Sequence, residues 1–426
     1  MSEPPEIDDA PLAVPSPPKG ALGIIFLIVL SDLLGFSIII PLLPFYARHY
    51  HGSDFQVGLL FSVYSICQLI GSPILGLVSD RFGRRPVLIF SQVGSVLGFV
   101  LLGIATHGDW FNPTLGLWLV YISRVVDGLS GGNISIAQAY ISDVTTGAER
   151  TRGMGVLGAA FGIGFTIGPA LGGVLGHYNP SYPAFAAALC SAIAATQTWL
   201  RLPEPQVHGH SETENWLHPS RFLPIIRNTA LLQMLLIFFF SMMAFVMMES
   251  TFAIYLNDLL GFNELKVGLL FALAGVTIAV VQGGLVGRLS KRLGPWPLVI
   301  LGPLFVTLAM LMLASLSWHA ALGIILLAVI VNAGGRSLQT PTLSALISHT
   351  GDPRQQGTVF GLFHMLGSLA RVIGPMSTIA YTHHHASPYL IAAAITFAIS
   401  IWSAWLKTYV QGREVQRGFD VAVGSS

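Results

Sequence analysis

The sequence predicts an all-α integral membrane protein of about twelve transmembrane helices, arranged as two similar six-helix bundles. Three observations support this prediction. Only 10% of the residues are charged while 53% are hydrophobic, apolar windows recur along almost the whole chain, and motifs of the first half return in the second. Soluble proteins carry about 25% charged residues, so water is not the main solvent of this chain.

Each apolar window holds about 20 residues, which is enough for a helix to cross a hydrocarbon core about 30 Å thick. In chain order, the expected spans are 22–46, 57–78, 86–106, 115–140, 154–176, 182–200, 230–255, 267–289, 296–316, 320–347, 358–381 and 389–406. Lys and Arg concentrate in alternate loops, on the side that also carries both termini. Because cytoplasmic loops are the basic ones, we expect a multi-pass protein of the inner (plasma) membrane with both termini in the cytoplasm.

Polar segments divide the chain into regions. Residues 1–20 hold several acids among prolines, a composition typical of a disordered tail, which we place in the cytoplasm. We expect a first six-helix bundle over 21–200, a cytoplasmic linker over 201–228, a second bundle over 229–408 and a cytoplasmic tail over 409–426. The linker is too polar to span a membrane and separates the two halves.

The two halves repeat each other. The stretch QVGLLF from Gln56 matches KVGLLF from Lys266, and GFTIGPALGG from Gly164 corresponds to LARVIGPMST from Leu369. Parallel six-helix repeats are a known transporter plan, with the binding site near the bilayer midplane between them. The duplication therefore favours transport by alternating access.

The stretch GLVSDRFGRRP, residues 76–86, concentrates charge between two apolar windows. Arginines in such a loop serve to orient the protein, but acids contribute little to orientation, so Asp80 indicates a local role. Gly83 suits a tight turn, and Asp80 beside arginines can form charge-assisted hydrogen bonds. The stretch is either a plain orienting loop or part of a charge network.

This loop resembles the signature loop of the major facilitator superfamily. RVVDGLSGG from Arg124 and GFTIGPALGG from Gly164 resemble the fourth-helix and fifth-helix motifs of that family, the latter associated with drug:proton antiporters. SDLLGFSIIIPLLP from Ser31 is similar to the first helix of the tetracycline-efflux and multidrug-resistance group. The resemblance covers nearly all of residues 20–408. One departure is Gly98, which stands where tetracycline exporters carry an acid in the third helix.

The resemblance implies a conformational latch. In the family, the loop acid and arginine pair with an acid at the cytoplasmic end of the fourth helix, and Asp143 in YISDVTTGAER matches that position. Such a latch would hold the two halves together on the cytoplasmic side. The residues assigned to it are Gly76, Asp80, Arg81, Gly83, Arg84, Arg85 and Asp143.

The fifth-helix motif also predicts a hinge. Small residues let membrane helices approach closely, and a proline removes a backbone donor and can bend a helix. The expected hinge residues are Gly164, Gly168, Pro169, Gly172 and Gly173.

Ionisable side chains inside the spans are candidates for proton coupling, because a charge at a helix centre costs roughly 2.5 to 3.5 kcal/mol. Asp32 is the first choice for the proton site, and the alternative is a structural, hydrogen-bonded acid. Glu249 is a second proton site, a recognition group for cationic substrates or the partner of an arginine. Arg124 and Asp127 lie three residues apart, so they either neutralise each other or tune a coupling carboxylate.

Polar side chains inside the spans are candidates to line a substrate cavity. They are Tyr64, Gln68, Asn133, Gln138, Gln282, Asn332, Arg336 and Gln339. We expect Arg336, and likewise Arg371, either to hold helices together or to fix an anionic part of a substrate.

These features predict a secondary active transporter that exports drugs or amphipathic small molecules in exchange for protons. The alternative is a proton-coupled importer or facilitator of an organic metabolite. No clustered nucleophile, metal-ligand set or cofactor loop is recognisable in the sequence, so we predict no enzymatic activity, metal or cofactor. The expected partners are a small-molecule substrate, protons and the lipid bilayer, without nucleic acid, and we expect the chain to function as a monomer.

Overall fold

The computed structural model describes residues 21–424 apart from 109, 146, 206–222, 226, 320 and 352–355. Within these residues every regular element is helical and there is no strand. Eleven of the described helices are long and apolar enough to cross a membrane. The predicted all-α membrane class is therefore confirmed. The predicted N-terminal tail and most of the predicted linker lie outside the described residues.

The first half begins with a crossing in three pieces, because Pro41 and Pro44 occupy the first turns of its second and third pieces. Side-chain caps start two later helices, with Ser53 and Gln56 forming a capping box and Asn112 accepting a backbone hydrogen bond from Leu115. The elements are α1 (Ala21–Ile39), η1 (Ile40–Leu42), α2 (Leu43–His49), α3 (Asp54–Phe82), α4 (Arg84–Ala105), α5 (Pro113–Ser130), α6 (Asn133–Val144), α7 (Gly147–Tyr178) and α8 (Tyr182–Arg201).

The predicted fourth span, residues 115–140, is divided in the structure. Helix α5 ends at Ser130 and α6 begins at Asn133, with two glycines at 131–132 between them. Arg124 and Asp127 lower the hydropathy of α5, so this segment is not one of the eleven strongly apolar helices. Together α5 and α6 cover the predicted fourth span.

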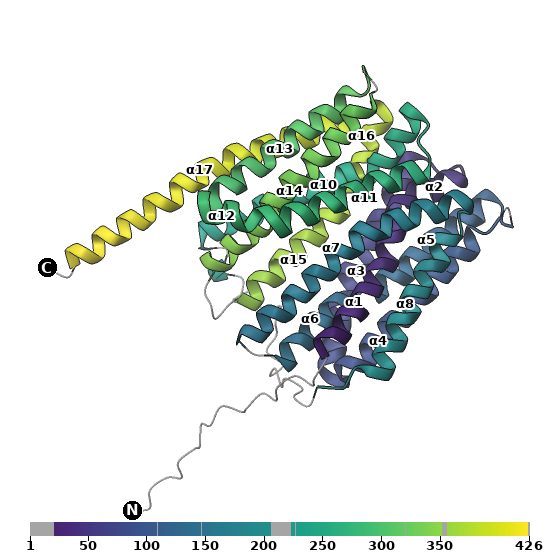
Figure 1. The fold of residues 1–426 in the computed structure, drawn as a ribbon, viewed down its shortest axis with the longest axis horizontal. Coiled ribbons are helices and arrows are strands. Elements are labelled where there is room, and N and C mark those ends of the chain that lie inside the picture. The colour runs from purple at the N-terminus through teal and green to yellow at the C-terminus, as the bar shows by residue number, and fades with distance from the viewer. Residues whose placement is uncertain are drawn as a thin grey trace, which may run out of the picture.

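The second half has the same plan. Asn228 and Asn263 cap its first two long helices by accepting backbone hydrogen bonds. The elements are α10 (Thr229–Leu260), α11 (Glu264–Val280), the π-helical η2 (Val281–Val286), α12 (Gly287–Leu293), α13 (Pro295–Ser315), α14 (Leu322–Thr350), α15 (Gln356–Ile373), the 3₁₀-helical η4 (Gly374–Ser377), α16 (Thr378–His383) and α17 (Ser387–Gly424). Helix α17 projects beyond the bundle (Figure 1), so the described part of the predicted C-terminal tail continues this helix.

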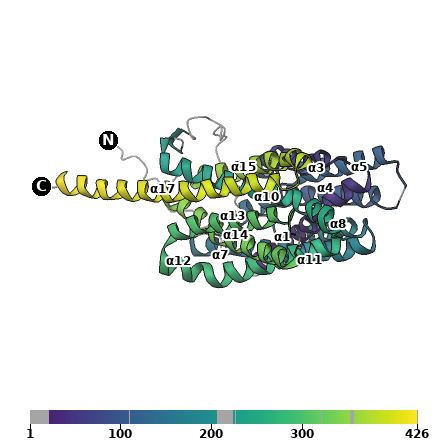
Figure 2. The same cartoon turned by 90° about the horizontal axis from the view of Figure 1, so that it is seen from above.

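The long helices of the two halves lie side by side and run in roughly parallel directions (Figure 1). We call the face where α1 begins and where the 76–86 loop lies the tail face. The opposite face, where α2 and α16 lie, is the distal face. Viewed from above, α3 and α15 lie on one side of the molecule and α7 and α11 on the other (Figure 2).

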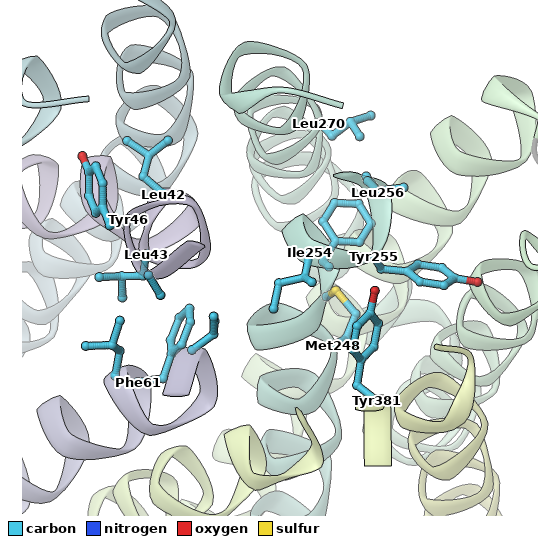
Figure 3. Close-up of a cluster of buried hydrophobic side chains, with 14 of the residues drawn as sticks. Leu42, Leu43, Tyr46, Phe61, Met248, Ile254, Tyr255, Leu256, Leu270 and Tyr381 are labelled. Atoms are coloured by element: carbon cyan, nitrogen blue, oxygen red, sulfur yellow. The ribbon is translucent and has the colours of Figure 1, made fainter. Parts of the chain in front are cut away.

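Buried apolar side chains form three clusters. One contains side chains of both halves, among them Leu43 and Phe61 from the first half and Met248 and Leu270 from the second (Figure 3). A second cluster contains only first-half side chains from residues 25–202, and a third only second-half side chains from residues 225–406. The halves therefore share one core near the distal face and have separate cores toward the tail face.

The repeated motifs lie where the halves touch. Gly58 of the first VGLLF packs against the backbone at Pro375, and Gly268 of the second VGLLF packs against the backbone at Pro169. A Cβ atom at Gly268 would lie 2.6 Å from the carbonyl oxygen of Pro169, closer than a side chain allows. Each VGLLF glycine thus contacts the Gly-Pro motif of the other half, and the internal repeat relates the two contacts.

Candidate functional site: a cavity between the two halves

A cavity lies between the two halves, next to the shared apolar core. First-half helices contribute Phe36, Phe61, Tyr64 and Arg124 to its walls, and second-half helices contribute Val246, Glu249 and Arg371. Most of the wall is apolar, and the charged groups come from both sides. The chemistry of its walls therefore suits a largely apolar molecule that carries a polar or charged group.

The predicted cavity residues separate into two sets. Tyr64 lines the cavity, and the side-chain amide of Gln68 donates a hydrogen bond to the Tyr64 hydroxyl group over 3.2 Å. The other six do not line it. Asn133 donates a hydrogen bond to Asp32, Gln339 donates one to the Ser241 hydroxyl group over 2.8 Å, and Arg336 lies on the ring of Phe245. Asn332 is buried, Gln138 is half-buried and Gln282 is exposed in η2. Their roles in substrate binding stay predictions.

The wall also contains residues that sequence reasoning did not assign to the cavity. Phe36 and Phe61 line it. Arg371 lines it too, and for this residue the sequence left open a role in holding helices together or in fixing an anionic part of a substrate. The two phenylalanines carry no distinguishing signal, because apolar side chains facing lipid and apolar side chains facing a cavity have the same chemistry. For Arg371, the signal was its charge inside an apolar helix.

Asp32 is held by a neutral partner. Its carboxylate accepts a hydrogen bond from the side-chain amide of Asn133, the first residue of α6, over 2.7 Å. No cation lies within ion-pair distance of Asp32 among the described residues, and the side chain is half-buried. This arrangement leaves the acid without a fixed counter-charge among the described residues.

Arg124 and Asp127 form the buried ion pair that their spacing suggested. Their side chains lie 3.3 Å apart on α5, and the residues are only 2% and 3% exposed. The Arg124 guanidinium also lies over the ring of Phe99, 5.5 Å from its centroid. A Cβ atom at Gly98 would lie 2.9 Å from the Cβ of Asp127, so the third-helix glycine leaves room for an acid carried by the neighbouring helix.

Glu249 and Arg371 face each other from two helices of the second half, α10 and α15. Both line the cavity, and both are close enough to Arg336 to interact with it electrostatically. None of the three makes an ion pair within 4.0 Å to a described residue. The guanidinium of Arg336 lies 3.2 Å from the ring centroid of Phe245, and one of its nitrogens is buried without a hydrogen-bond partner among the described residues.

The predicted latch residues meet at the tail face. The Arg84 side chain donates a hydrogen bond to Asp143 over 2.8 Å, forms an ion pair with Asp80, and donates to the Ser79 hydroxyl over 2.7 Å. These residues lie on α3, α4 and α6, all in the first half. In this structure the described contacts of the cluster therefore join helices within one half, and its role as a latch between the halves stays a prediction.

Glu204 completes this cluster and was not predicted. Its carboxylate accepts hydrogen bonds from the backbone N–H groups of Arg84 and Arg85, over 2.6 and 3.0 Å, at the N-terminus of α4. Anions are stabilised at that end of a helix. Gly83 is needed beside it, because its φ is 100° and a Cβ atom there would lie 2.7 Å from a Glu204 oxygen.

The remaining latch candidates are Arg85, Arg81 and Gly76, and their described contacts lie outside the Asp80, Arg84 and Asp143 cluster. The Arg85 side chain donates to the carbonyl oxygen of Trp199. Arg81 is exposed and lies over the ring of Phe82. A Cβ atom at Gly76 would meet nothing within 4 Å.

The predicted hinge glycines are packing positions in this structure. Gly164, Gly168 and Gly172 face α1, and the Ser37 hydroxyl group of α1 donates a hydrogen bond to the Gly164 carbonyl oxygen over 2.9 Å. Gly173 faces α11 instead, where a Cβ atom would lie 2.7 Å from the Glu264 carbonyl oxygen. Helix α7 therefore packs against one helix of each half through its glycines and Pro169, and its role as a hinge stays a prediction.

Charged groups join the halves at the distal face. Arg48 of α2 donates hydrogen bonds to both carboxylate oxygens of Asp258 on α10, over 2.5 and 2.9 Å, and to Asp54 over 2.9 Å. The Tyr381 hydroxyl group donates to Asp258 over 2.6 Å, and the Ser62 hydroxyl group donates to the Val372 carbonyl oxygen over 2.8 Å. We call Arg48, Asp54, Asp258 and Tyr381 the distal bridge. Sequence reasoning did not single it out.

Among the described residues, no group of three His, Cys, Asp or Glu side chains is placed to hold a metal ion. The chemistry that the cavity offers is that of ionisable and hydrogen-bonding side chains on an apolar wall.

The family model of the Major Facilitator Superfamily matches residues 25–375. The chain belongs to the Major Facilitator Superfamily. Its members are transporters of small molecules, and the chain is accordingly a multi-pass membrane transporter. The resemblance seen in the 76–86 loop and in the fourth and fifth helices is thereby confirmed.

Relatives cover almost the whole chain. The class B tetracycline resistance protein of Escherichia coli is 29% identical over 90% of this chain and 90% of its own length. The class G tetracycline resistance protein of Vibrio anguillarum is 32% identical over 83% of this chain and 88% of its own. The solved structure of the human organic anion transporter MFSD10 (TETRAN) is similar with a TM-score of 0.67 and 25% identity, over 90% of this chain and 99% of that one.

Proposed function

We propose that the protein is a proton-driven secondary transporter that exports amphipathic small molecules by alternating access. The observation that carries the proposal is the cavity, which has walls from both halves and ionisable groups on each wall. When the halves tilt, such a cavity changes the face to which it opens while its walls stay intact. The similarity to tetracycline resistance proteins supports export as the direction.

The structure supports a conformation closed at the distal face. The distal bridge and the shared apolar core join the halves there, whereas each half has its own core toward the tail face. With both termini in the cytoplasm of a plasma membrane, as the distribution of basic residues predicts, this state exposes the cavity to the cytoplasm. It is the state in which an exporter loads its substrate.

We assign the exchanged proton to Asp32. It has an amide partner and no counter-charge among the described residues, so its protonation changes the net charge of the first half. The ion pair of Arg124 and Asp127 contributes to the local field, since Asp127 lies within electrostatic range of Asp32. Glu249 is the second acid through which protonation can act.

The test is proton movement in proteoliposomes with an imposed pH gradient. A panel of tetracycline-like compounds, lipophilic cations and organic anions is added to wild type, Asp32→Asn and the matched control Glu264→Gln, an acid outside the cavity. We expect at least one compound to drive proton movement in the wild type and in the control, and roughly tenfold less in Asp32→Asn. Equal proton movement in all three proteins would exclude Asp32 as the exchange site.

The same assay distinguishes proton-driven export from the alternative functions, which are facilitated transport and proton-coupled import. A facilitator of an organic metabolite would move substrate at the same rate without a gradient, and a proton-coupled importer would move proton and substrate in the same direction. Opposite fluxes of proton and substrate are the result that the proposal requires.

The names of the relatives include tetracycline resistance proteins and an organic anion transporter. Only the second of these names states a charge, so the charge of this protein's substrate has to be inferred from its own cavity.

A further inference from the structure

We propose that the second-half wall of the cavity is an anion-binding site, in which Arg371, supported by Arg336, holds the carboxylate or a similar anionic group of an amphipathic organic substrate. The inference rests on the proposed function only in taking the cavity as the substrate site.

The two walls differ in charge. On the first-half wall Arg124 is paired with Asp127 at 3.3 Å, so the charges of this pair cancel. On the second-half wall Arg371 shares a single acid, Glu249, with Arg336, which lies outside the lining but within electrostatic range of both. Neither arginine is within 4.0 Å ion-pair distance of Glu249 or of any other described acid. The second-half wall therefore carries an excess positive charge even with Glu249 ionised.

The hydrogen-bonding capacity of these arginines is largely unused. A guanidinium has five N–H donors in a planar fork that matches a carboxylate. No described residue accepts a hydrogen bond from Arg371, which lines the cavity, and one nitrogen of Arg336 is buried without a partner while its plane lies on Phe245. Buried donors without partners are costly, so an anion with two or three acceptor oxygens would satisfy both the charge and the donors.

The apolar part of the cavity wall favours anions that also carry an apolar body. Phe36, Phe61 and Val246 are apolar, and Phe36 lies against the ring of Tyr64 at a centroid distance of 5.3 Å. A small hydrophilic anion would leave these surfaces in contact with water. An aromatic or aliphatic body with one anionic group buries against them while its charge meets Arg371.

Glu249 weakens the binding of an anion at this site. Its carboxylate and a bound anion would compete for the same two arginines, so removing the charge of Glu249 should strengthen anion binding. For the same reason this assignment leaves the exchanged proton to Asp32, which lies in the first half.

The test compares three probes that share one ring system: 2-naphthylacetate, its amide, and 2-(2-naphthyl)ethylammonium. Equilibrium binding is measured on the purified full chain in detergent, without any gradient. We expect the wild type to bind the carboxylate roughly ten- to a hundredfold more tightly than the amide, the range of a charge-assisted hydrogen-bonded pair, and to bind the ammonium probe most weakly.

The variants locate the site. Arg371→Gln should remove the advantage of the carboxylate while leaving the amide unchanged, Arg371→Lys should keep part of it, and Glu249→Gln should increase it. Arg292→Gln, which removes an exposed arginine of α12, is the matched control and should bind like the wild type. Thermal unfolding of each variant shows whether it is folded, and the wild-type comparison stands even if Arg371→Gln does not fold.

Equal binding of the three probes, no binding of the carboxylate, or a preference for the ammonium probe would overturn the inference. An equal loss of all three probes in folded Arg371→Gln would also overturn it. The proposed function fails differently: if the carboxylate is preferred but no gradient drives any flux, the anion site stands and proton-driven export does not. Gradient-driven flux with a preference for cations would support proton-driven transport and overturn the anion site.

Discussion

The two faces of the molecule use charge in different ways. At the distal face Arg48 reaches across from one half to Asp258 of the other, whereas at the tail face the larger cluster of Asp80, Arg84, Asp143 and Glu204 joins helices of the first half alone. The number of charged groups therefore does not indicate where the halves are held together. Their distribution between the halves does, and in this conformation it closes the distal face.

The corresponding loop of the second half sharpens this contrast. Gly294 ends α12 and precedes α13 with φ 80° and ψ 172°, much as Gly83, with φ 100° and ψ 152°, stands between α3 and α4. At the positions of Asp80 and Arg84 the second half has Lys291 and Pro295. The backbone of the loop is thus repeated in both halves, while the charge cluster belongs to the first half only.

The largest effect is expected from steric separation of the halves at the distal face. Gly173→Ala places a Cβ atom 2.7 Å from the Glu264 carbonyl oxygen, and overpacking of this kind costs about 1 to 3 kcal/mol. We expect a longer distance between spin labels at the exposed Trp110 and Trp318, one in each half. Gly162→Ala on the same helix is the control, because its Cβ atom meets nothing within 4 Å. An equal change in both variants would contradict the proposed contact.

Breaking the tail-face cluster should destabilise one half without moving the distal face. Glu204→Gln removes the charged acceptor at the N-terminus of α4, and losses of helix caps cost about 0.5 to 2 kcal/mol. We expect a lower midpoint of thermal unfolding and an unchanged label distance across the distal face. A longer label distance in Glu204→Gln would show that this cluster also holds the halves together.

Breaking the distal bridge should shift the balance between conformations by a smaller amount. The side chains of Arg48 and Asp258 are 27% and 25% exposed, so solvent screens them and we expect a coupling of about 1 kcal/mol. The coupling is measured by a double-mutant cycle of Arg48→Gln and Asp258→Asn on the fraction of molecules closed at the distal face. Additive effects of the two substitutions would mean that the pair contributes nothing to closure.

The smallest structural effect is expected for Asp80→Asn. Asp80 has a side chain that is 41% exposed, and Arg84 keeps its bond to Asp143, so the loss in stability should be about 0.5 kcal/mol or less. If the cluster acts as a latch in the opposite conformation, transport should nevertheless slow while binding of the naphthyl probes stays unchanged. Equal losses of transport and binding would count against the latch.

Much of the fold was predictable because a membrane allows few solutions. Continuous apolar windows predicted the crossings, but the division of the fourth one at the glycines 131–132 was not predicted. The repeated VGLLF and Gly-Pro motifs predicted two related halves. That these motifs contact each other across the halves was not predictable, because the amino-acid sequence does not show which residues a glycine will contact in the folded protein.

The site was predictable where charge stood out. Arg124, Glu249 and Arg371, which line the cavity, stood out in the sequence because charges inside apolar helices are rare. The bond from Arg48 to Asp258 joins residues 210 positions apart, and the bond from the Arg84 backbone to Glu204 spans 120. Pairs so distant have no local pattern, so only the folded structure brings them together.

The reciprocal contacts of Gly58 with Pro375 and of Gly268 with Pro169 have a mechanical consequence. Both press a glycine closely against a backbone carbonyl group of the other half, with the Thr378 side chain also against Gly58. They lie on opposite sides of the molecule, one at α3 and the other at α11 and α7 (Figure 2). Two such contacts define a line about which one half can rotate. A rotation of one half about the line through them moves its two ends in opposite directions, so the same small turn that parts the distal face brings the tail face together.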